Sequence, residues 1–104
     1  MAATPESKVK KKVVAILKKH KCYYFYPVTG GFGKSGVPDI IVCAYGRFVG
    51  IECKAGKNTP TALQKKNLNE IAAALGYAMV VNENNIDEVE TILNLIAETA
   101  GIDR

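Results

Sequence analysis

The sequence predicts an α/β fold in which helices surround a mixed central sheet of four strands. Three observations lead to this prediction. Two segments begin with a Thr-Pro pair, which is a common helix start, and a third helical pattern closes the chain. Between them lie two short apolar runs separated by a Tyr-Gly pair that suits a hairpin turn. The predicted order is αβββαβα, and 104 residues have room for one domain, 1–104, with a single core.

The first helix is expected to have Thr4 as its N-cap, Pro5 in its first position and an end near His20. Lysines fill one face of this helix, and the run 8–21 either solvates that face or contacts a polyanion. His20 is expected to be exposed. The buried face is predicted from apolar residues at helical spacing, namely Val9, Val13, Ile16 and Leu17.

An aromatic segment and a glycine-rich segment follow the first helix. The aromatic segment, 23–27, predicts a strand closed by Pro27. Its rings are expected to pack in the core, with base stacking as the alternative. Segment 29–36 contains four glycines and is predicted to be a loop. It either approaches a phosphate, with Lys34 on it, or is a mobile surface loop.

The two strongest strand candidates are 39–44 and 48–54, which are largely apolar on both faces, as central strands are. Tyr45-Gly46 between them suits a two-residue turn. Ala44 and Arg47 flank such a turn and pair with each other. The residue numbers of every facing pair in the hairpin therefore sum to 91. The turn therefore predicts the register of the whole hairpin.

This register places three charged side chains together. Asp39 lies directly opposite Glu52, with Cβ atoms about 4.5–5.5 Å apart. Lys54 is two residues beyond Glu52 and projects from the same face of the sheet. Facing carboxylates repel each other unless a cation lies between them, and Mg²⁺ prefers carboxylate and carbonyl oxygens. The pattern predicts either a divalent-metal site or a simple ion pair of Lys54 with one of the carboxylates.

The second half of the chain is predicted to form a helix, a strand and a helix. The Thr-Pro pair opens a helix over 59–75, which Gly76 ends. Tyr77–Val81 is a short fourth strand. Asn85 is expected to cap the last helix, with Glu88 three residues on as in a capping box. The buried face of this helix is predicted to carry Ile86, Val89, Leu93 and Ile96.

Composition narrows the class of protein. A hydrophobic content of 48% with 23% charged residues is ordinary for a soluble globular protein. No apolar run approaches the roughly 20 residues that span a bilayer, and the start of the chain does not resemble a signal peptide. We therefore expect no membrane contact and a cytoplasmic location, in the host cytoplasm if the protein is viral. Reduced thiols are expected of Cys22, Cys43 and Cys53, which lack C-x-x-C spacing.

The charge is distributed unevenly along the chain. Residues 1–66 hold thirteen Lys and Arg against three acids, a balance of +10, whereas residues 67–104 hold one Arg against seven acids, a balance of −6. A strongly basic half is a plausible contact surface for a polyanion such as nucleic acid.

The charged cluster also resembles a known motif. Gly36-Val37-Pro38-Asp39, followed after twelve residues by Glu52-Cys53-Lys54, is similar to the PD-(D/E)xK motif of the restriction-endonuclease-like superfamily. The loop glycines 33–36, the strand 50–55 and Gln64 early in the next helix resemble the VRR-NUC family, the virus-type replication-repair nuclease domain. The resemblance covers about 6–81. It implies a restriction-endonuclease-like αβββαβ core with an extra C-terminal helix.

The resemblance implies a role for each matching position. Asp39, Glu52 and the backbone carbonyl of Cys53 would bind Mg²⁺ or Mn²⁺. Lys54 would be the catalytic lysine, and Gln64 would orient that lysine or the attacking water. The Cys53 thiol occupies the variable position of the motif and is expected to point into the core.

Further contacts are expected around this centre. Glu6 matches a glutamate that the family often carries on its first helix, where it would reach the metal through water. Alternatively, Glu6 is only a favourable charge in the first turn of a helix. DNA is expected to contact Lys34, Ser35, Lys57 and Lys65.

The implied activity is that of a metal-dependent endodeoxyribonuclease, a hydrolase of phosphodiester bonds. Stand-alone, phage-like VRR-NUC domains resemble Holliday-junction resolvases of DNA repair, and the absence of further domains favours this form. Cutting a four-way junction needs two symmetric incisions, so we expect branched DNA as substrate and a homodimer joined through the first or last helix. The alternatives are the same chemistry on flaps, ends or simple duplex, and a catalytically silent basic DNA-binding module.

Overall fold

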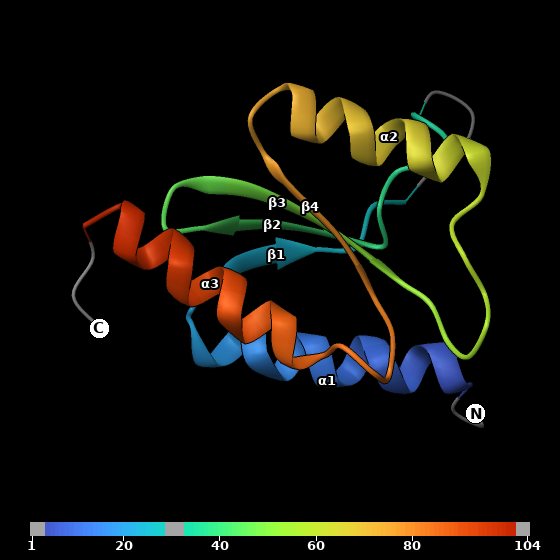
Figure 1. Cartoon of the computed structure of the whole chain (residues 1–104), viewed down its shortest axis with the longest axis horizontal. Coiled ribbons are helices and arrows are strands. Elements are labelled where there is room, and N and C mark those ends of the chain that lie inside the picture. The colour runs from blue at the N-terminus through green and yellow to red at the C-terminus, as the bar shows by residue number, and fades with distance from the viewer. Residues whose placement is uncertain (1–3, 29–32, 102–104) are drawn as a thin grey trace.

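The predicted order of elements is confirmed in the computed structural model, which describes residues 4–28 and 33–101 (Figure 1). In chain order the elements are α1 (Pro5–Lys19), β1 (Tyr23–Phe25), β2 (Ile40–Ala44), β3 (Arg47–Cys53), α2 (Ala62–Ala73), β4 (Tyr77–Val81) and α3 (Asp87–Thr99). The first half of the predicted glycine-rich loop, 29–32, lies outside the described residues. No helix in the described part of the chain is long and apolar enough to cross a bilayer.

The sheet is mixed, with the strand order β1-β2-β3-β4. β1, β2 and β3 pair antiparallel, whereas β3 and β4 pair parallel because α2 makes the crossover between them. The predicted hairpin register is confirmed: Ala44 pairs with Arg47, and Ile40 pairs with Ile51. Tyr45 and Gly46 have φ values of 52° and 79°, as a tight hairpin turn requires.

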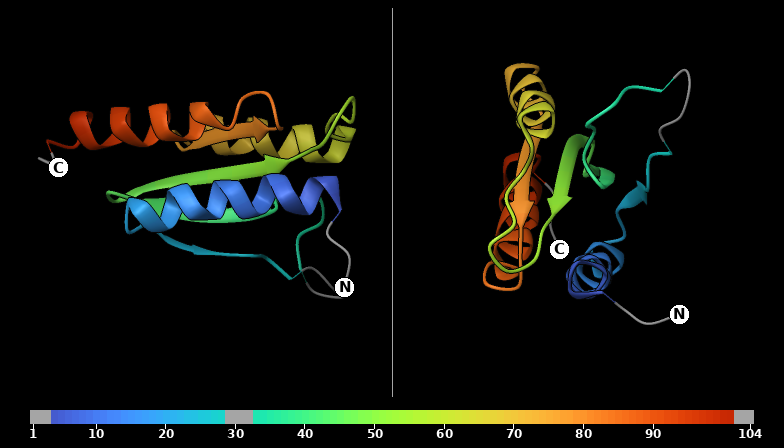
Figure 2. Two further views of the ribbon diagram at one scale, coloured as in Figure 1. Left: turned by 90° about the horizontal axis from the view of Figure 1, so that it is seen from below. Right: turned by 90° about the vertical axis from the view of Figure 1, so that its right-hand side faces the viewer.

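Helices cover both faces of the sheet. Figures 1 and 2 show α1 and α3 side by side on one face and α2 on the other. The face toward α1 and α3 forms the core, whose fully buried side chains include Leu17, Val42, Ile51, Leu93 and Ile96. On the face toward α2, a Cβ at Gly50 would lie 2.7 Å from Ile71 Cδ1 and 2.9 Å from Pro38 Cγ, so glycine lets helix and sheet approach without displacing either side chain.

α2 begins two residues later than predicted. Thr61, not Thr59, is its N-cap, and the Thr61 hydroxyl accepts a hydrogen bond from the Gln64 backbone N–H at 3.2 Å. In return, the Gln64 side-chain oxygen accepts a hydrogen bond from the Thr61 N–H at 2.9 Å. The start predicted at Thr59-Pro60 was wrong because this reciprocal capping box satisfies two backbone donors, whereas a proline satisfies none.

The C-terminal end of α2 and the start of α3 also differ from the prediction. Leu75, not Gly76, takes the left-handed φ of 70° after α2. Ile86 occupies the N-cap position of α3 without a side-chain hydrogen bond, so the prediction that Asn85 caps this helix was wrong. The Asn85 side chain instead accepts a hydrogen bond from the Asn82 N–H and donates to the Val80 carbonyl. Asn85 therefore closes the turn after β4.

The four aromatic residues of segment 23–27 were predicted to pack in the core, and for three of them this was wrong. Tyr26, directly after β1, is 49% exposed. Tyr23 and Phe25 are 71% and 47% exposed, and only Tyr24 packs against the core. Tyr23 and Phe25 pair with Cys43 and Ile41, on the face of the sheet that carries α2. They are exposed because α2 contacts β3 and β4 and does not reach the β1 edge.

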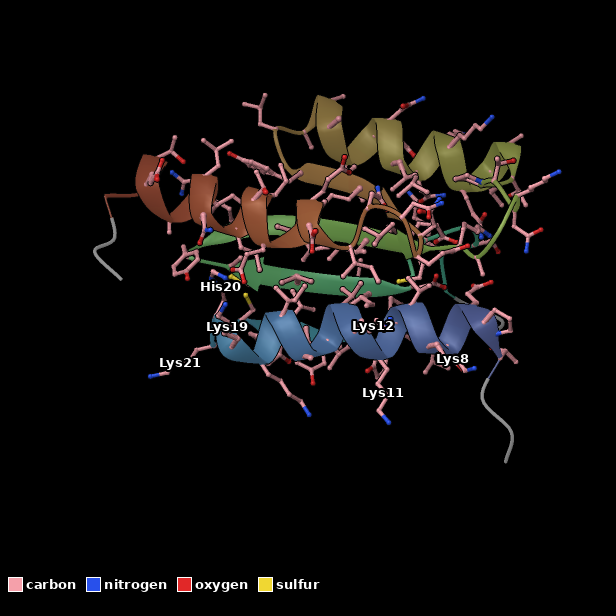
Figure 3. All side chains as sticks on the ribbon, turned by 60° about the horizontal axis from the view of Figure 1, so that its bottom comes forward. Lys8, Lys11, Lys12, Lys19, His20 and Lys21 are labelled. Carbon is pink, nitrogen blue, oxygen red and sulfur yellow. The ribbon has the colours of Figure 1, made fainter. Side chains whose placement is uncertain are left out.

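His20 was also predicted wrongly, because its side chain is only 4% exposed. Its Nδ1 lies 2.8 Å from the Tyr45 hydroxyl, and its Nε2 pairs with the Glu90 carboxylate of α3. The Lys19 ammonium lies 2.8 Å from the same carboxylate. Hydrogen bonds from Lys19 and His20 lower the pKa of Glu90. This cluster joins the end of α1, the hairpin turn and α3 (Figure 3).

We expect His20→Ala to lower the free energy of unfolding by about 1–3 kcal/mol, because it leaves two polar partners without their hydrogen bonds. Urea denaturation at pH 7 measures this change. Lys18→Ala, an exposed substitution on the same helix, is the control and should stay within about 0.5 kcal/mol of the wild type. An equally small effect of His20→Ala would show that the cluster does not stabilise the fold.

Candidate active site

Two carboxylates and an ammonium lie together at the end of the β2–β3 hairpin. The ladder ends with Ile40 opposite Ile51, so the next facing pair is Asp39 and Glu52. Asp39 Oδ2 accepts a 2.8 Å hydrogen bond from the Cys53 N–H. Lys54 Nζ lies 3.2 Å from Glu52 Oε2. The three charged groups predicted from the hairpin register are thus neighbours.

The turn before Asp39 is held in place by α2. Gly36 has a φ of 76°, and a Cβ there would lie 2.5 Å from Leu63 Cγ, so the turn needs glycine for both its conformation and its space. Asn67 is only 4% exposed, and its Nδ2 donates to the Ser35 carbonyl at 3.0 Å. The Asn67 amide therefore fixes the chain just before Asp39.

Glu52 is the unusual residue of the site, because it is charged and almost fully buried, at 1% exposed. Neither of its carboxylate oxygens has a well-aligned hydrogen-bond donor among the described residues, so the 3.2 Å contact with Lys54 is an ion pair. Burial raises the pKa of Glu52, and the negative charge of Asp39 raises it further, although Lys54 opposes both effects. A buried carboxylate is costly unless a cation neutralises it, and the single charge of Lys54 here faces the two carboxylates of Glu52 and Asp39.

A divalent metal fits this arrangement. No group of three or more His, Cys, Asp or Glu side chains in the described ranges could hold a metal by itself. The facing carboxylates of Asp39 and Glu52 could supply two ligands, and the Cys53 carbonyl and water would complete the set. Mg²⁺ suits such a set, because it binds through one or two carboxylates and keeps several waters.

The Cys53 thiol takes no part in this chemistry. It is fully buried in the core, as predicted. Burial, followed by the charge of Asp39, raises the pKa of Cys53 to about 12. The thiol therefore lies in the core, away from the charged groups of the site, and stays protonated near neutral pH in the metal-free protein.

A hollow of about 270 Å³ opens in front of Asp39, and we call it the Asp39 cleft. α1, the segment after β1, the turn before β2 and α2 all contribute to it. Its lining residues are Lys10, Tyr26, Pro27, Gly36, Val37, Pro38, Asp39 and Gln64.

Two solved structures share this architecture. One, named "VRR_NUC domain", superposes with a TM-score of 0.69 and 19% identity over 88% of this chain and 97% of that chain. The other, named "VRR_NUC domain protein", superposes with a TM-score of 0.70 and 23% identity over 93% and 91%. No family sequence model and no curated protein matches this chain.

The chain has the VRR-NUC fold. The restriction-endonuclease-like core predicted from the sequence is thereby confirmed. The motif 36–39 lies on the turn before β2, and Glu52 and Cys53 close β3, with Lys54 directly after it. The catalytic and metal-binding roles that the sequence resemblance implied for these residues stay predictions.

Two further predicted residues lie near the centre of this VRR-NUC fold. Gln64 lines the Asp39 cleft, but its side-chain oxygen accepts the capping hydrogen bond from Thr61, so its NH₂ group remains to contact lysine or water. Glu6 lines a neighbouring hollow of about 520 Å³ with Lys10 and the loop after β3. Its charge slightly raises the pKa of Cys53, which places Glu6 at the same end of the sheet.

The predicted DNA contacts lie outside the Asp39 cleft. Lys34 is 3.4 Å from Glu70 of α2 and lines a separate apolar hollow between α2 and the sheet. Ser35 is exposed, and its carbonyl is bound by Asn67. Lys57 and Lys65 are exposed, with Lys65 on the outer side of α2. The roles of these four residues stay predictions.

The sequence interpretation missed Asn67 and Lys10. Asn67 lies four residues after Leu63 and four before Ile71, so a polar residue on the inner stripe of α2 was the available signal. In the sequence, Lys10 could not be distinguished from the other lysines of α1. Its position beside the apolar residues three and four further along, Val13 and Val14, was the signal that it faces inward.

Proposed function

We propose that this protein is a divalent-metal-dependent endonuclease that hydrolyses phosphodiester bonds of DNA. The observation that carries the proposal is Glu52: a fully buried carboxylate that faces a second carboxylate, Asp39, and has Lys54 as its ion-pair partner. A purely structural role does not explain this carboxylate, because a buried apolar side chain of similar size would destabilise the fold less. The fold shared with structures named VRR_NUC domain supports the same conclusion.

Each residue of the site would have a separate role in the hydrolysis. Asp39 and Glu52, with the Cys53 carbonyl, would hold Mg²⁺ or Mn²⁺. When bound, this ion polarises a phosphoryl oxygen and lowers the pKa of a coordinated water. The Cys53 N–H keeps the Asp39 carboxylate oriented. The Lys54 ammonium would stabilise the negative charge that develops on the phosphoryl group, and the Gln64 NH₂ group would orient the attacking water.

The Asp39 cleft has the dimensions of a shallow surface site. Its volume of about 270 Å³ is close to the lower end of the roughly 300–1,000 Å³ of pockets that enclose a small molecule. It has room for a short stretch of backbone, with the rest of the substrate lying on the surface. The +10 charge balance of residues 1–66 suits a polyanionic chain.

A labelled-DNA assay tests the proposal. Duplex, flap and four-way-junction DNAs are incubated with Mg²⁺, Mn²⁺ or EDTA, and cleavage is expected with either metal and not with EDTA. Cleavage confined to flaps, ends or duplex would keep the chemistry and change the substrate. DNA binding without cleavage in any metal would instead favour the alternative of a catalytically silent DNA-binding module.

We further propose a homodimer that nicks four-way junctions at paired positions, since a twofold axis can coincide with that of the junction. α1 and α3 remain the proposed contacts, and Leu95 of α3 is 48% exposed. The exposed Tyr23, Phe25 and Phe48 of the sheet offer a further apolar surface.

Affinity for the junction should fall steeply with salt, because binding releases counterions from the DNA. Light scattering measures the assembly, and product mapping on a junction measures the cut positions. A strict monomer that cuts duplex and junction equally well would contradict the resolvase proposal and leave the metal chemistry intact.

A further inference from the structure

Lys10 differs from the other lysines of α1 in the direction it faces. Lys8, Lys11 and Lys12 are exposed, and Figure 3 shows Lys11 projecting away from the sheet. Lys10 is partly buried and lies on the inner side of the helix, three residues before the fully buried Val13. A lysine on the inner side of a helix keeps its ammonium at the edge of the core, and here that edge is the Asp39 cleft.

The Lys10 ammonium lies above the ring of Tyr26, 5.5 Å from its centroid. Both residues line the Asp39 cleft, and Lys10 also lines the neighbouring hollow that contains Glu6. In the described part of the chain, Lys10 has no carboxylate within ion-pairing distance. The Lys10 ammonium therefore lines the cleft without a direct ion-pair partner, while Asp39 supplies the carboxylate of the same lining.

Tyr26 offers a fixed aromatic surface. Its ring packs edge-on against Tyr24, with centroids 6.1 Å apart and an angle of 64° between the planes. Tyr24 is anchored against the core, so it holds Tyr26 in place, while Tyr26 remains 49% exposed. A half-exposed, supported ring beside a positive charge is the arrangement on which an unpaired base stacks while its phosphate is neutralised.

We infer that Lys10 and Tyr26 form a nucleotide subsite next to the scissile phosphate. The Lys10 ammonium binds an adjacent phosphate, and the Tyr26 ring stacks on an unpaired base. This inference rests on the proposed nuclease function and specifies its substrate class. Because a base can stack on Tyr26 only when it has left the duplex stack, the subsite favours DNA in which the base beside the cut is unpaired or is opened at a branch point.

Fluorescence anisotropy in EDTA tests the subsite without cleavage. The wild type, Lys10→Ala, Tyr26→Ala and Tyr26→Phe are titrated with a labelled forked DNA and with the matching full duplex. Lys11→Ala is the matched control, since it removes the same charge from the outward face one residue away. Thermal melts followed by circular dichroism establish that every variant is folded.

Lys10→Ala should weaken binding of the fork about tenfold and reduce the slope of log affinity against log salt by about 1. Lys11→Ala should change affinity less than about twofold. Tyr26→Ala should weaken binding of the fork by about 5- to 150-fold and binding of the duplex much less, whereas Tyr26→Phe should behave as the wild type.

Equal effects of Lys10→Ala and Lys11→Ala would overturn the phosphate contact. An equal effect of Tyr26→Ala on fork and duplex, or no effect on either, would overturn the stacking contact, and absence of DNA binding by the wild type would overturn both. A parallel cleavage assay with Mn²⁺ separates this inference from the proposed function. Wild-type cleavage with unchanged binding in Lys10→Ala and Tyr26→Ala would refute the subsite alone, and binding as expected without cleavage would refute the nuclease alone.

Discussion

Glu52→Gln is expected to abolish metal binding and cleavage while making the metal-free protein more stable. Glutamine has the shape of glutamate without its charge, so it removes the ligand and also the cost of a buried carboxylate. Cleavage should fall by about 10²-fold or more, because the metal and the charge stabilisation that it supplies are lost together. Opposite effects on activity and stability distinguish a functional residue from a structural one.

The stability change should depend on pH in a defined direction. Burial and Asp39 raise the pKa of Glu52 above its ordinary 4.5, so the folded protein binds this proton more tightly than the unfolded chain does. At pH values above the folded pKa, the ionised Glu52 therefore lowers the free energy of unfolding of the metal-free wild type. This loss of stability decreases as the pH falls through the folded pKa toward 4.5. Glu52→Gln should lack this pH dependence.

Calorimetric titration with Mn²⁺ and urea denaturation in EDTA between pH 5 and 8 measure these effects. Glu98→Gln is the control, because Glu98 is exposed on α3 and should change neither quantity. Asp39→Asn is the matching change at the second ligand, since an amide oxygen can still accept the hydrogen bond from the Cys53 N–H. Unchanged Mn²⁺ affinity in both Glu52→Gln and Asp39→Asn would remove the metal site.

Lys54→Ala is expected to retain metal and DNA binding but to lose cleavage by on the order of 10²-fold or more. An ammonium cannot ligate a cation, so its proposed contribution lies in the stabilisation of developing charge. Lys54 is also the ion-pair partner of Glu52, at 3.2 Å and with 13% of its side chain exposed. Its removal should therefore raise the pKa of Glu52 further and lower the stability of the metal-free protein.

Single-turnover cleavage with Mn²⁺ and anisotropy in EDTA separate these effects. Lys18→Ala, which removes an exposed lysine at the far end of α1, is the control for a general loss of positive charge. Wild-type turnover in Lys54→Ala would assign Lys54 to the ion pair with Glu52 alone. A parallel loss of DNA binding and cleavage would assign it to substrate binding.

Much of the site could be predicted because its geometry is local. Tyr45-Gly46 sets the hairpin turn, and the turn sets the register that brings Asp39 opposite Glu52, so a few neighbouring residues determine the central pair. The N-cap of α1 at Thr4 and the strand β4 (Tyr77–Val81) follow from similarly local patterns.

The start of α2 was a different case, because two local signals competed. Thr59-Pro60 and the Thr61–Gln64 capping box are both visible in the sequence. The structure uses the second, since it satisfies two backbone donors. Both signals for the start of α2 are local. Choosing between them requires knowing which hydrogen bonds form, and residue types alone do not show that.

Burial was decided only by the tertiary structure. His20 follows a run of lysines, yet it is buried because α3 brings Glu90 to it from seventy residues away. Tyr23 and Phe25 are apolar, yet they are exposed because α2 does not extend over the β1 edge.

The Asp39 cleft shows the same division. The sequence alone predicted which charged residues lie together at the end of the hairpin, because turn geometry and strand alternation act over a few residues. Only the packing of α1 and α2 against the sheet decided that Lys10, Tyr26 and Gln64 join Asp39 around one hollow. The free energy of that packing comes from contacts between residues far apart in the chain, and no local pattern records where those contacts form.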